Sequence, residues 1–238
     1  MNDASAEVNK PAADGEPPHA PHQANAPNQA NAPHQPHKPH APLAVFVSGG
    51  GRSLENLVAL NTSGELEAPI GLVLSNRADA YALDRAALHG LPSRVIDAER
   101  ALSPADFSTA AFAAAEQAGC GLVVLAGFLR LLVIPEQWRG RVLNIHPALL
   151  PAYGGKGYYG ERVHRAVLAA GETQSGCTVH FVDNHYDTGP IILQRKVPVL
   201  PTDTVDSLAG RVFQEELHAL PAAIRLCLDG KTPSPAAT

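Results

Sequence analysis

Residues 43–53 read Leu-Ala-Val-Phe-Val-Ser-Gly-Gly-Gly-Arg-Ser, and they contain three local signals in a row. The first five residues are apolar, which predicts a short buried strand. Three glycines follow, and glycine permits the tight backbone turn that leaves such a strand. Leu54, Leu57 and Val58 then recur at helical spacing. The stretch therefore predicts a strand, a glycine loop and a helix, which is the opening of an α/β fold.

The same alternation continues along the chain and predicts a Rossmann-like α/β domain. Helices between strands form right-handed crossovers, so we expect a mostly parallel, twisted sheet flanked by helices. Two later apolar runs have no helix between them, which predicts an antiparallel strand pair near the C-terminal part. The predicted strands are residues 43–47, 70–74, 94–96, 122–126, 142–144, 178–182 and 191–194, and the later predicted helices are residues 78–88, 103–117 and 204–228.

Composition changes sharply at residue 42 and divides the chain into two parts. Residues 1–42 are rich in Pro, Ala, His, Asn and Gln, so we expect a disordered tail that is partly polyproline II. Residues 43–238 are expected to form one domain. His34, His37 and His40 are three residues apart, which would line them up on a polyproline II helix. We interpret them as low-complexity sequence, with a weak Zn or Ni site as the alternative.

The overall composition argues against several classes of protein. A net charge of −5 and 5% aromatic residues argue against nucleic-acid binding. No apolar run reaches the ~18 residues of a membrane helix, and the first residues lack the features of a secretory signal. The three cysteines, Cys120, Cys177 and Cys227, are widely spaced and indicate reduced thiols rather than a disulfide framework or a metal site. We therefore expect a cytoplasmic protein with small-molecule partners and no membrane or nucleic-acid partner.

The glycine loop is a candidate phosphate site. Gly50 and Gly51 allow backbone N–H groups to approach an anion at a helix N-terminus, and Arg52 and Ser53 add a charge and a hydroxyl donor. Leu54 stands where a dinucleotide fingerprint has its third glycine, and no Walker A lysine follows. The loop therefore suits a single phosphate, as on a mononucleotide. The alternative is a tight turn without a ligand.

Two further stretches contain groups suited to acid–base chemistry. Asn144 and His146 lie two residues apart at the end of a predicted strand, so both side chains point to the same side. An amide donates to an oxyanion, and an imidazole titrates near neutral pH. Asp187 lies in the connection between two apolar strands, where it would orient His146 and raise its pKa. The alternatives are a structural histidine and an ordinary turn.

Other polar residues of these regions are better explained by structure. His180 sits inside an alternating strand, and we interpret it as a satisfied residue of the sheet. His164 lies in a helical stretch and is expected to serve packing. Cys177 has no obvious activating base and is expected to be a small core residue. No metal site is predicted in the domain.

Three stretches together resemble the phosphoribosylglycinamide formyltransferase family: residues 124–130, residues 144–151, and residues 178–182 followed by residues 187–190. The similarity extends from about residue 43 to the last helix. The resemblance implies the formyltransferase fold and transfer of a formyl group from 10-formyltetrahydrofolate to the amine of glycinamide ribonucleotide, in purine biosynthesis. It implies no metal, and a monomer or homodimer is compatible with it.

The resemblance also implies roles for individual residues. Asn144 would donate to the formyl oxygen, His146 would donate a proton, and Asp187 would raise the pKa of His146 and position water. The ribonucleotide would contact Gly50, Gly51, Arg52, Ser53 and Glu216, and the folate would contact Leu129, Arg130, Leu131, Leu132, Asn144, Asp183 and Tyr186. A folate-contacting arginine of the family falls at Pro104 here, and Arg100 is a candidate replacement.

Three alternatives remain open at this stage. Methionyl-tRNA formyltransferase would need a further basic domain, for which about ten residues after Leu228 leave no room. Formyltetrahydrofolate deformylase would need a folded domain in place of residues 1–42. A non-catalytic nucleotide-binding module has no need for Asn144, His146 and Asp187 to converge, so their distances in a structure distinguish it from an enzyme.

Overall fold

A computed structural model describes residues 41–97 and 103–232, in which strands and helices alternate as predicted. The strands are β1 (Leu43–Val47), β2 (Ile70–Ser75), β3 (Ser93–Val95), β4 (Leu122–Leu125), β5 (Val142–His146), β6 (Gln174–Phe181) and β7 (Ile191–Pro198). The helices are α1 (Arg52–Thr62), α2 (Tyr81–Leu88), α3 (Pro104–Gln117), α4 (Glu161–Ala169) and α5 (Val205–Leu228), with a short 3-10 helix at Glu136–Trp138.

Two predictions concern residues that the structure does not describe. The tail of residues 1–42 lies outside the described residues except for Ala41 and Pro42, and Arg100 lies outside them as well. Both therefore stay predictions. Pro42 already contacts the domain, because its carbonyl oxygen accepts a hydrogen bond of 2.8 Å from the N–H of Gly121.

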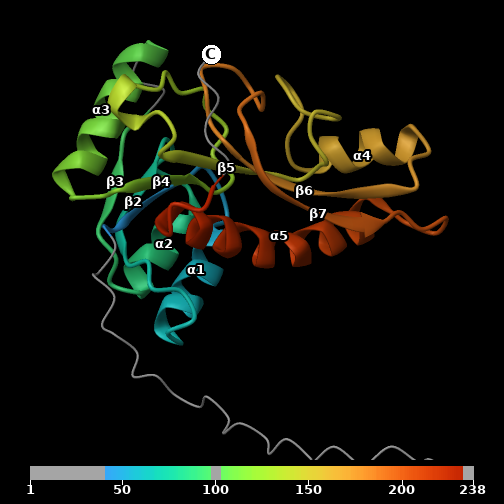
Figure 1. Ribbon diagram of the computed structural model, residues 1–238, viewed down its shortest axis with the longest axis horizontal. Coiled ribbons are helices and arrows are strands. Elements are labelled where there is room, and N and C mark those ends of the chain that lie inside the picture. The colour runs from blue at the N-terminus through green and yellow to red at the C-terminus, as the bar shows by residue number, and fades with distance from the viewer. Residues whose placement is uncertain (1–40, 98–102, 233–238) are drawn as a thin grey trace, which may run out of the picture. The chain divides into compact units, whose positions relative to one another are not determined.

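The seven described strands form one sheet in the order β3-β2-β1-β4-β5-β6-β7 (Figure 1). The first five strands of this order are parallel to one another. β6 runs antiparallel to β5, and β7 runs antiparallel to β6. The predicted antiparallel pair is therefore confirmed. Because β1, β4 and β5 are parallel, the segments that follow them meet at one edge of the sheet, where open α/β sheets bind ligands.

Successive side chains of the strands point to opposite faces of the sheet and pack there in two hydrophobic cores. On one face Val45 of β1 packs with residues of α1, α2 and α5, such as Leu54 and Leu208. On the other face Phe46 packs against α3, where Phe112 lies 6.2 Å from it between ring centroids. None of the helices in the described ranges is long and apolar enough to span a bilayer.

Some element boundaries differ from the prediction. α2 begins at Tyr81 rather than at residue 78. The Ser75 side chain bonds both the N–H and the carbonyl of Arg77, and this local turn holds the backbone away from helical geometry. In α5 Leu208, Val212 and Leu220 face the core and are buried, whereas Leu217 is only partly buried.

Candidate active site

A cavity of about 770 Å³ opens where β1, β4 and β5 end. This volume is typical of small-molecule sites. Ten of the fourteen residues predicted for substrate, folate or catalysis line it: Gly50, Gly51, Arg52, Ser53, Leu129, Asn144, His146, Tyr186, Asp187 and Glu216. The other four do not line it: Arg130, Leu131, Leu132 and Asp183.

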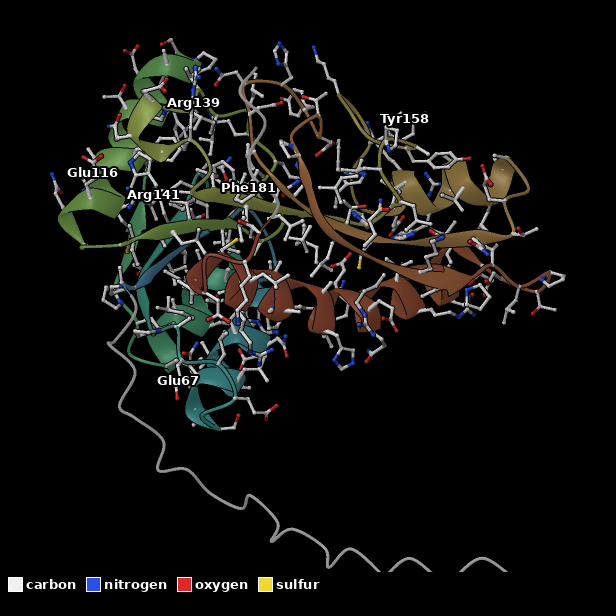
Figure 2. The ribbon with its side chains drawn as sticks, in the orientation of Figure 1. Glu67, Glu116, Arg139, Arg141, Tyr158 and Phe181 are labelled. Carbon is white, nitrogen blue, oxygen red and sulfur yellow. The ribbon has the colours of Figure 1, made fainter. Side chains whose placement is uncertain are left out.

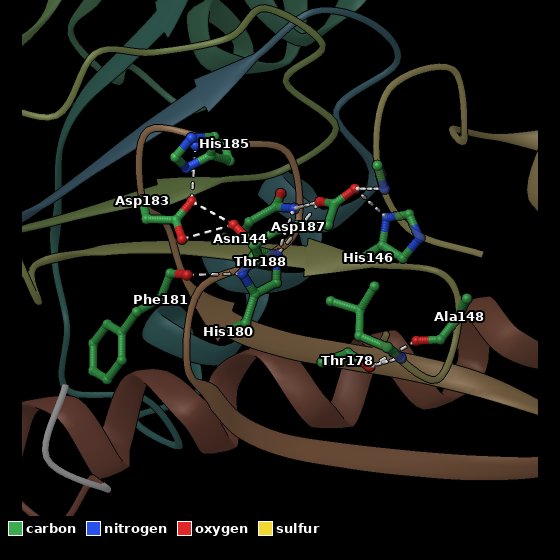
Figure 3. A network of polar contacts seen from close by, with 12 residues as sticks. Asn144, His146, Ala148, Thr178, His180, Phe181, Asp183, His185, Asp187 and Thr188 are labelled. Atoms are coloured by element: carbon green, nitrogen blue, oxygen red, sulfur yellow. Dashed lines mark hydrogen bonds and ion pairs between the residues drawn. The ribbon is translucent and has the colours of Figure 1, made fainter. Parts of the chain in front are cut away.

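The three predicted catalytic side chains meet in this cavity (Figure 3). Asn144 and His146 project from β5, and Asp187 comes from the connection between β6 and β7. His146 Nδ1 lies 3.6 Å from Asp187 Oδ2, and Asn144 Nδ2 donates to Asp187 Oδ1 at 3.2 Å. An amide, an imidazole and a carboxylate are thus within reach of one bound molecule.

The backbone around Asp187 holds its carboxylate in place. Asp187 has a φ of 57°, a left-handed conformation that aspartate tolerates better than most residues. The N–H of Gly155 donates to its Oδ2 at 2.9 Å. Two residues on, a Cβ at Gly189 would lie 1.9 Å from the carbonyl oxygen of Phe181, so this turn requires glycine. The position of Asp187 is therefore set by close backbone packing.

Opposing effects set the charge of the Asp187 carboxyl. Burial by itself raises its pKa, but the contacts with His180, His146 and the N–H of Gly155 together lower the pKa below its ordinary value. Asp187 is therefore ionised at neutral pH and acts as a fixed negative charge beside His146.

His146 is buried, and one of its nitrogens is already bonded. Its Nε2 lies 2.8 Å from the carbonyl oxygen of Tyr153, so Nε2 carries a hydrogen and donates. Burial lowers the pKa of His146 more than Asp187 and the Tyr153 carbonyl raise it. The expectation from sequence is thus corrected in one respect: Asp187 raises the pKa, but burial outweighs it. In the resting site Nδ1 is an unprotonated nitrogen that faces Asp187.

His180 belongs to the site, which sequence reasoning missed. Its side chain is buried, and its Nδ1 donates to the carbonyl oxygen of Phe181 at 2.8 Å. Its Nε2 is then an acceptor, 3.1 Å from Asn144 Nδ2. His180 is a satisfied residue of the sheet, as predicted, but it also orients Asn144. The signal was hidden because the register that pairs Asn144 with His180 involves two strands distant in sequence.

The glycine loop and the start of α1 form another part of the cavity lining. Gly51 has a φ of 71°, and no side chain caps the N-terminus of α1. The Arg52 guanidinium lies 3.9 Å from the ring centroid of Phe213. Burial raises the pKa of Glu216 to about 7, against the opposing charge of Arg52. This part of the lining offers backbone donors, a guanidinium and a carboxyl group.

The chain was compared with known proteins. A family model described as formyl transferase matches residues 41–224 of the 238 residues. The chain belongs to the formyl transferase family. The chain is 41% identical over 180 residues to a chloroplastic phosphoribosylglycinamide formyltransferase of Vigna unguiculata, covering 73% of this chain and 56% of that protein. The chain spans about half the length of that relative.

Two further comparisons agree with the family and the fold. The chain is 42% identical over 190 residues to the trifunctional purine biosynthetic protein adenosine-3 of Gallus gallus, covering 79% of this chain and 18% of that protein. Glycinamide ribonucleotide transformylase 1 from Symbiobacterium toebii superposes with a TM-score of 0.76 at 39% identity, over 84% of this chain and 92% of that one. The predicted family and fold are confirmed.

The residues predicted to contact the folate fall into two groups. Leu129 and Tyr186 are exposed side chains on the cavity wall, suited to an aromatic ligand. Leu132 is only 2% exposed and packs in the core. The Arg130 guanidinium lies 4.6 Å from the Phe107 ring centroid. Neither residue lines the cavity, and the prediction that they contact the folate stays a prediction.

The Asp183 carboxylate forms hydrogen bonds within its own turn. It accepts hydrogen bonds from the N–H of His185 at 2.9 Å and from Thr188 Oγ1 at 2.7 Å (Figure 3). These bonds shape the turn that presents Asp187. The prediction of Asp183 as a folate contact remains a prediction, and the geometry favours a role within the loop.

The remaining side chains of the cavity include one buried histidine and an aromatic rim. His164 of α4 lines the cavity and is 4% exposed, and burial lowers its pKa. Tyr158 lies on the segment before α4 at the rim (Figure 2). Within residues 41–97 and 103–232 no group of three or more His, Cys, Asp or Glu side chains could hold a metal ion.

Proposed function

We propose that the chain transfers the formyl group of 10-formyltetrahydrofolate to the amine of 5-phosphoribosylglycinamide, a step of de novo purine biosynthesis in the cytoplasm. The observation that carries the proposal is the meeting of Asn144, His146 and Asp187 in the cavity that also contains the glycine loop. The family and the named relatives support the reaction class. Both substrates are small molecules, and a monomer or homodimer would suffice because all these residues come from one chain.

The reaction joins an amine to a formyl carbon. The amine nitrogen attacks the formyl carbon, and the carbonyl oxygen becomes an oxyanion in a tetrahedral intermediate. The attacking nitrogen then loses a proton, N10 of the folate gains one, and the bond between carbon and N10 breaks. This sequence calls for a donor to the oxyanion, a proton carrier near neutral pH and two substrates held in line.

His146 is the proton carrier in this proposal, and Nδ1 is its reactive nitrogen. Nε2 is held by the Tyr153 carbonyl, whereas Nδ1 faces Asp187 at 3.6 Å. A proton that arrives on Nδ1 creates an imidazolium beside an ionised carboxylate, which Asp187 stabilises. The protonated Nδ1 can then donate toward the developing oxyanion or the leaving nitrogen.

Asn144 is the proposed oxyanion donor, and it has to share its hydrogens. Both hydrogens of Nδ2 have partners in the resting site, namely His180 Nε2 at 3.1 Å and Asp187 Oδ1 at 3.2 Å. These bonds are long for hydrogen bonds, so a formyl oxygen competes well for one of them. The donor is thus oriented before substrate binds.

The two substrates are assigned to different parts of the cavity lining. The phosphate of the ribonucleotide is assigned to the N–H groups of Gly50, Gly51 and Ser53, with Arg52 and Glu216 nearby. The formyl donor is assigned to the wall with Leu129 and Tyr186. The formyl carbon and the amine would then meet at Asn144 and His146.

The test is an assay of the purified protein with glycinamide ribonucleotide and 10-formyltetrahydrofolate. We expect formylated ribonucleotide and tetrahydrofolate in equal amounts. Release of formate without the ribonucleotide would instead indicate a deformylase. Binding of ribonucleotide with no turnover under any condition would indicate a nucleotide-binding module, and either result contradicts the proposal.

A further inference from the structure

Helix α2 holds the glycine loop from the side. The carbonyl oxygen of Gly49 accepts a hydrogen bond of 3.0 Å from the N–H of Ala82, near the start of α2. The carbonyl oxygen of the next residue, Gly50, accepts one of 2.9 Å from Nε of Arg85. Two successive carbonyl groups of the loop are thus tied to the same helix.

These two bonds determine where the loop's N–H groups point. In a planar trans peptide the C=O and the N–H point in opposite directions. With the carbonyls of Gly49 and Gly50 directed at α2, the N–H groups of Gly50 and Gly51 point away from it. Neither N–H has a hydrogen-bond partner among the described residues. Successive N–H groups on one side form an anion-binding concavity.

Without a restraint, the loop would have other conformations. A Cβ at Gly49 or Gly50 would meet nothing within 4 Å, so packing does not hold these residues. Glycine populates both signs of φ, and peptide groups between glycines rotate readily. The bond from Arg85 is the side-chain contact that opposes such a rotation at the peptide between Gly50 and Gly51.

Arg85 is itself fixed by a carboxylate on α1. Its Nη1 donates to Glu55 Oε2 at 2.8 Å, and the other carboxylate oxygen of Glu55 lies 2.8 Å from His89 Nε2. The Arg85 side chain is 28% exposed. The planar guanidinium therefore connects α1, α2 and the loop in one geometry.

We propose that Arg85 is a positioning residue for ribonucleotide binding: it holds the peptide between Gly50 and Gly51 so that its N–H group faces the substrate phosphate. The proposal rests on the proposed function, because it assumes a phosphate at this loop. Arg85 does not line the cavity and acts through the loop. Its removal should weaken the ribonucleotide site and leave the folate site unchanged.

The first test is steady-state kinetics of Arg85→Met, which keeps an unbranched stem without donors. We expect the KM for the ribonucleotide to rise about tenfold, because a hydrogen bond from a charged donor is lost. The KM for the folate and kcat should change less than twofold. Arg85→Lys keeps the charge and one donor, and should show a rise of about threefold. Equal losses for both substrates, or an unchanged ribonucleotide KM in both variants, overturn the proposal.

Two matched variants separate positioning from general charge or stability effects. Glu55→Gln removes the ion pair but leaves the bond from Arg85 to Gly50, so its effect should be smaller than that of Arg85→Met. Arg139→Met removes an exposed arginine that pairs with Glu136 at 3.0 Å and does not line the cavity (Figure 2). It should leave both KM values unchanged. An effect of Arg139→Met as large as that of Arg85→Met overturns the assignment.

The second test does not depend on turnover. Calorimetry with ribose 5-phosphate measures phosphate binding by the full chain, even if the formyl transfer assay fails. We expect about tenfold weaker binding for Arg85→Met and an intermediate value for Arg85→Lys. If the wild type binds ribose 5-phosphate and both variants bind it with the same affinity, the proposed role of Arg85 is contradicted. Absence of ribose 5-phosphate binding by the wild type contradicts the phosphate site on which the role rests, whereas failure of the transfer assay alone contradicts only the proposed reaction.

Discussion

At the scale of single residues, the charge of His146 depends on two effects of opposite sign. Burial disfavours the imidazolium, and the carboxylate of Asp187 favours it. Because burial is the larger effect, the resting imidazole is neutral, with its hydrogen on Nε2 facing Tyr153. In the proposed reaction His146 would therefore act first as a base, and then as an acid once the substrate amine has given a proton to Nδ1.

Asp187→Asn should lower the pKa of His146 further, since the charge that opposes burial is removed. The limb of the pH–rate profile that reports the ionisation of His146 should then move to lower pH. The rate at neutral pH should fall on the order of 10²–10⁴-fold. The measurement is kcat as a function of pH. Asp183→Asn is the matched control, because Asp183 bonds its own turn and should leave that limb in place.

Asn144→Ala removes the proposed donor to the formyl oxygen. We expect kcat to fall on the order of 10²–10³-fold, the usual cost of losing one oxyanion donor. Both KM values should change much less, because the donor acts mainly on the transition state. Single-turnover and steady-state kinetics distinguish the two effects. A variant with raised KM values and a normal kcat would show that Asn144 contributes to substrate binding rather than to stabilisation of the transition state.

Glu216 carries a stability cost that depends on pH. Its pKa is about 7 in the folded chain against 4.5 ordinarily, so the folded state holds a proton that the unfolded state releases. The free energy of unfolding therefore falls as pH rises through this window. Glu216→Gln should be more stable than the wild type above pH 7, by about 1–3 kcal/mol, with little difference near pH 4.5. It should also bind the ribonucleotide more weakly.

Thermal melting at several pH values checks this expectation. Glu215→Gln is the control, because Glu215 lies next to Glu216 on α5 but pairs with Arg195. The control should show no gain in stability at high pH. A difference between Glu216→Gln and wild type that stays constant with pH would mean that Glu216 titrates at its ordinary pKa.

At the scale of elements, the loop between β1 and α1 uses its glycines for different purposes. Gly51 has a φ of 71°, and a Cβ there would lie 2.7 Å from the Cβ of Ala82. The φ of Gly50 is not in the left-handed range, and a Cβ at Gly50 would meet nothing within 4 Å. Glycine at position 51 therefore allows α1 and α2 to pack closely. Position 50 faces open space, where a side chain would disturb ligand binding rather than packing.

Gly51→Ala and Gly50→Ala should accordingly separate stability from binding. Gly51→Ala should lower the free energy of unfolding on the order of 1–3 kcal/mol, through backbone strain and displacement of α2. Gly50→Ala should keep the melting temperature and alter only the ribonucleotide KM. Denaturant unfolding and kinetics on the two variants measure this. A similar loss of stability in both would contradict the division of roles.

At the scale of the whole molecule, the proposed catalytic and binding residues that line the cavity all come from residues 50–216. Removal of residues 1–40 is expected to leave turnover and melting temperature nearly unchanged, because that composition has little apolar surface to bury. The truncation keeps Pro42, whose carbonyl bonds Gly121. A loss of activity above about tenfold, or ~1.4 kcal/mol in barrier height, would show that the tail takes part.

Much of the architecture follows from local patterns along the chain. The apolar run of β1 and the cap of α3 at Ser103 are decided by residues within one turn or one strand, so they were visible in the sequence. The start of α2 was wrong by three residues, because a side-chain bond from Ser75 competes with the helix. The residue types of the candidate site were visible too, since Asn144 and His146 lie two residues apart on one strand.

The relations among distant side chains had to come from the tertiary structure. The register of β5 with β6 brings His180 to Asn144, and the connection after β6 carries Asp187 back to His146. No local periodicity encodes such distances, because they depend on strand pairing and loop packing across the sheet. The same holds for Arg85, whose contact with Gly50 depends on how α2 packs against the glycine loop. The pKa of His146 is likewise a tertiary property, because burial and the Asp187 charge act only once the chain has folded around the imidazole.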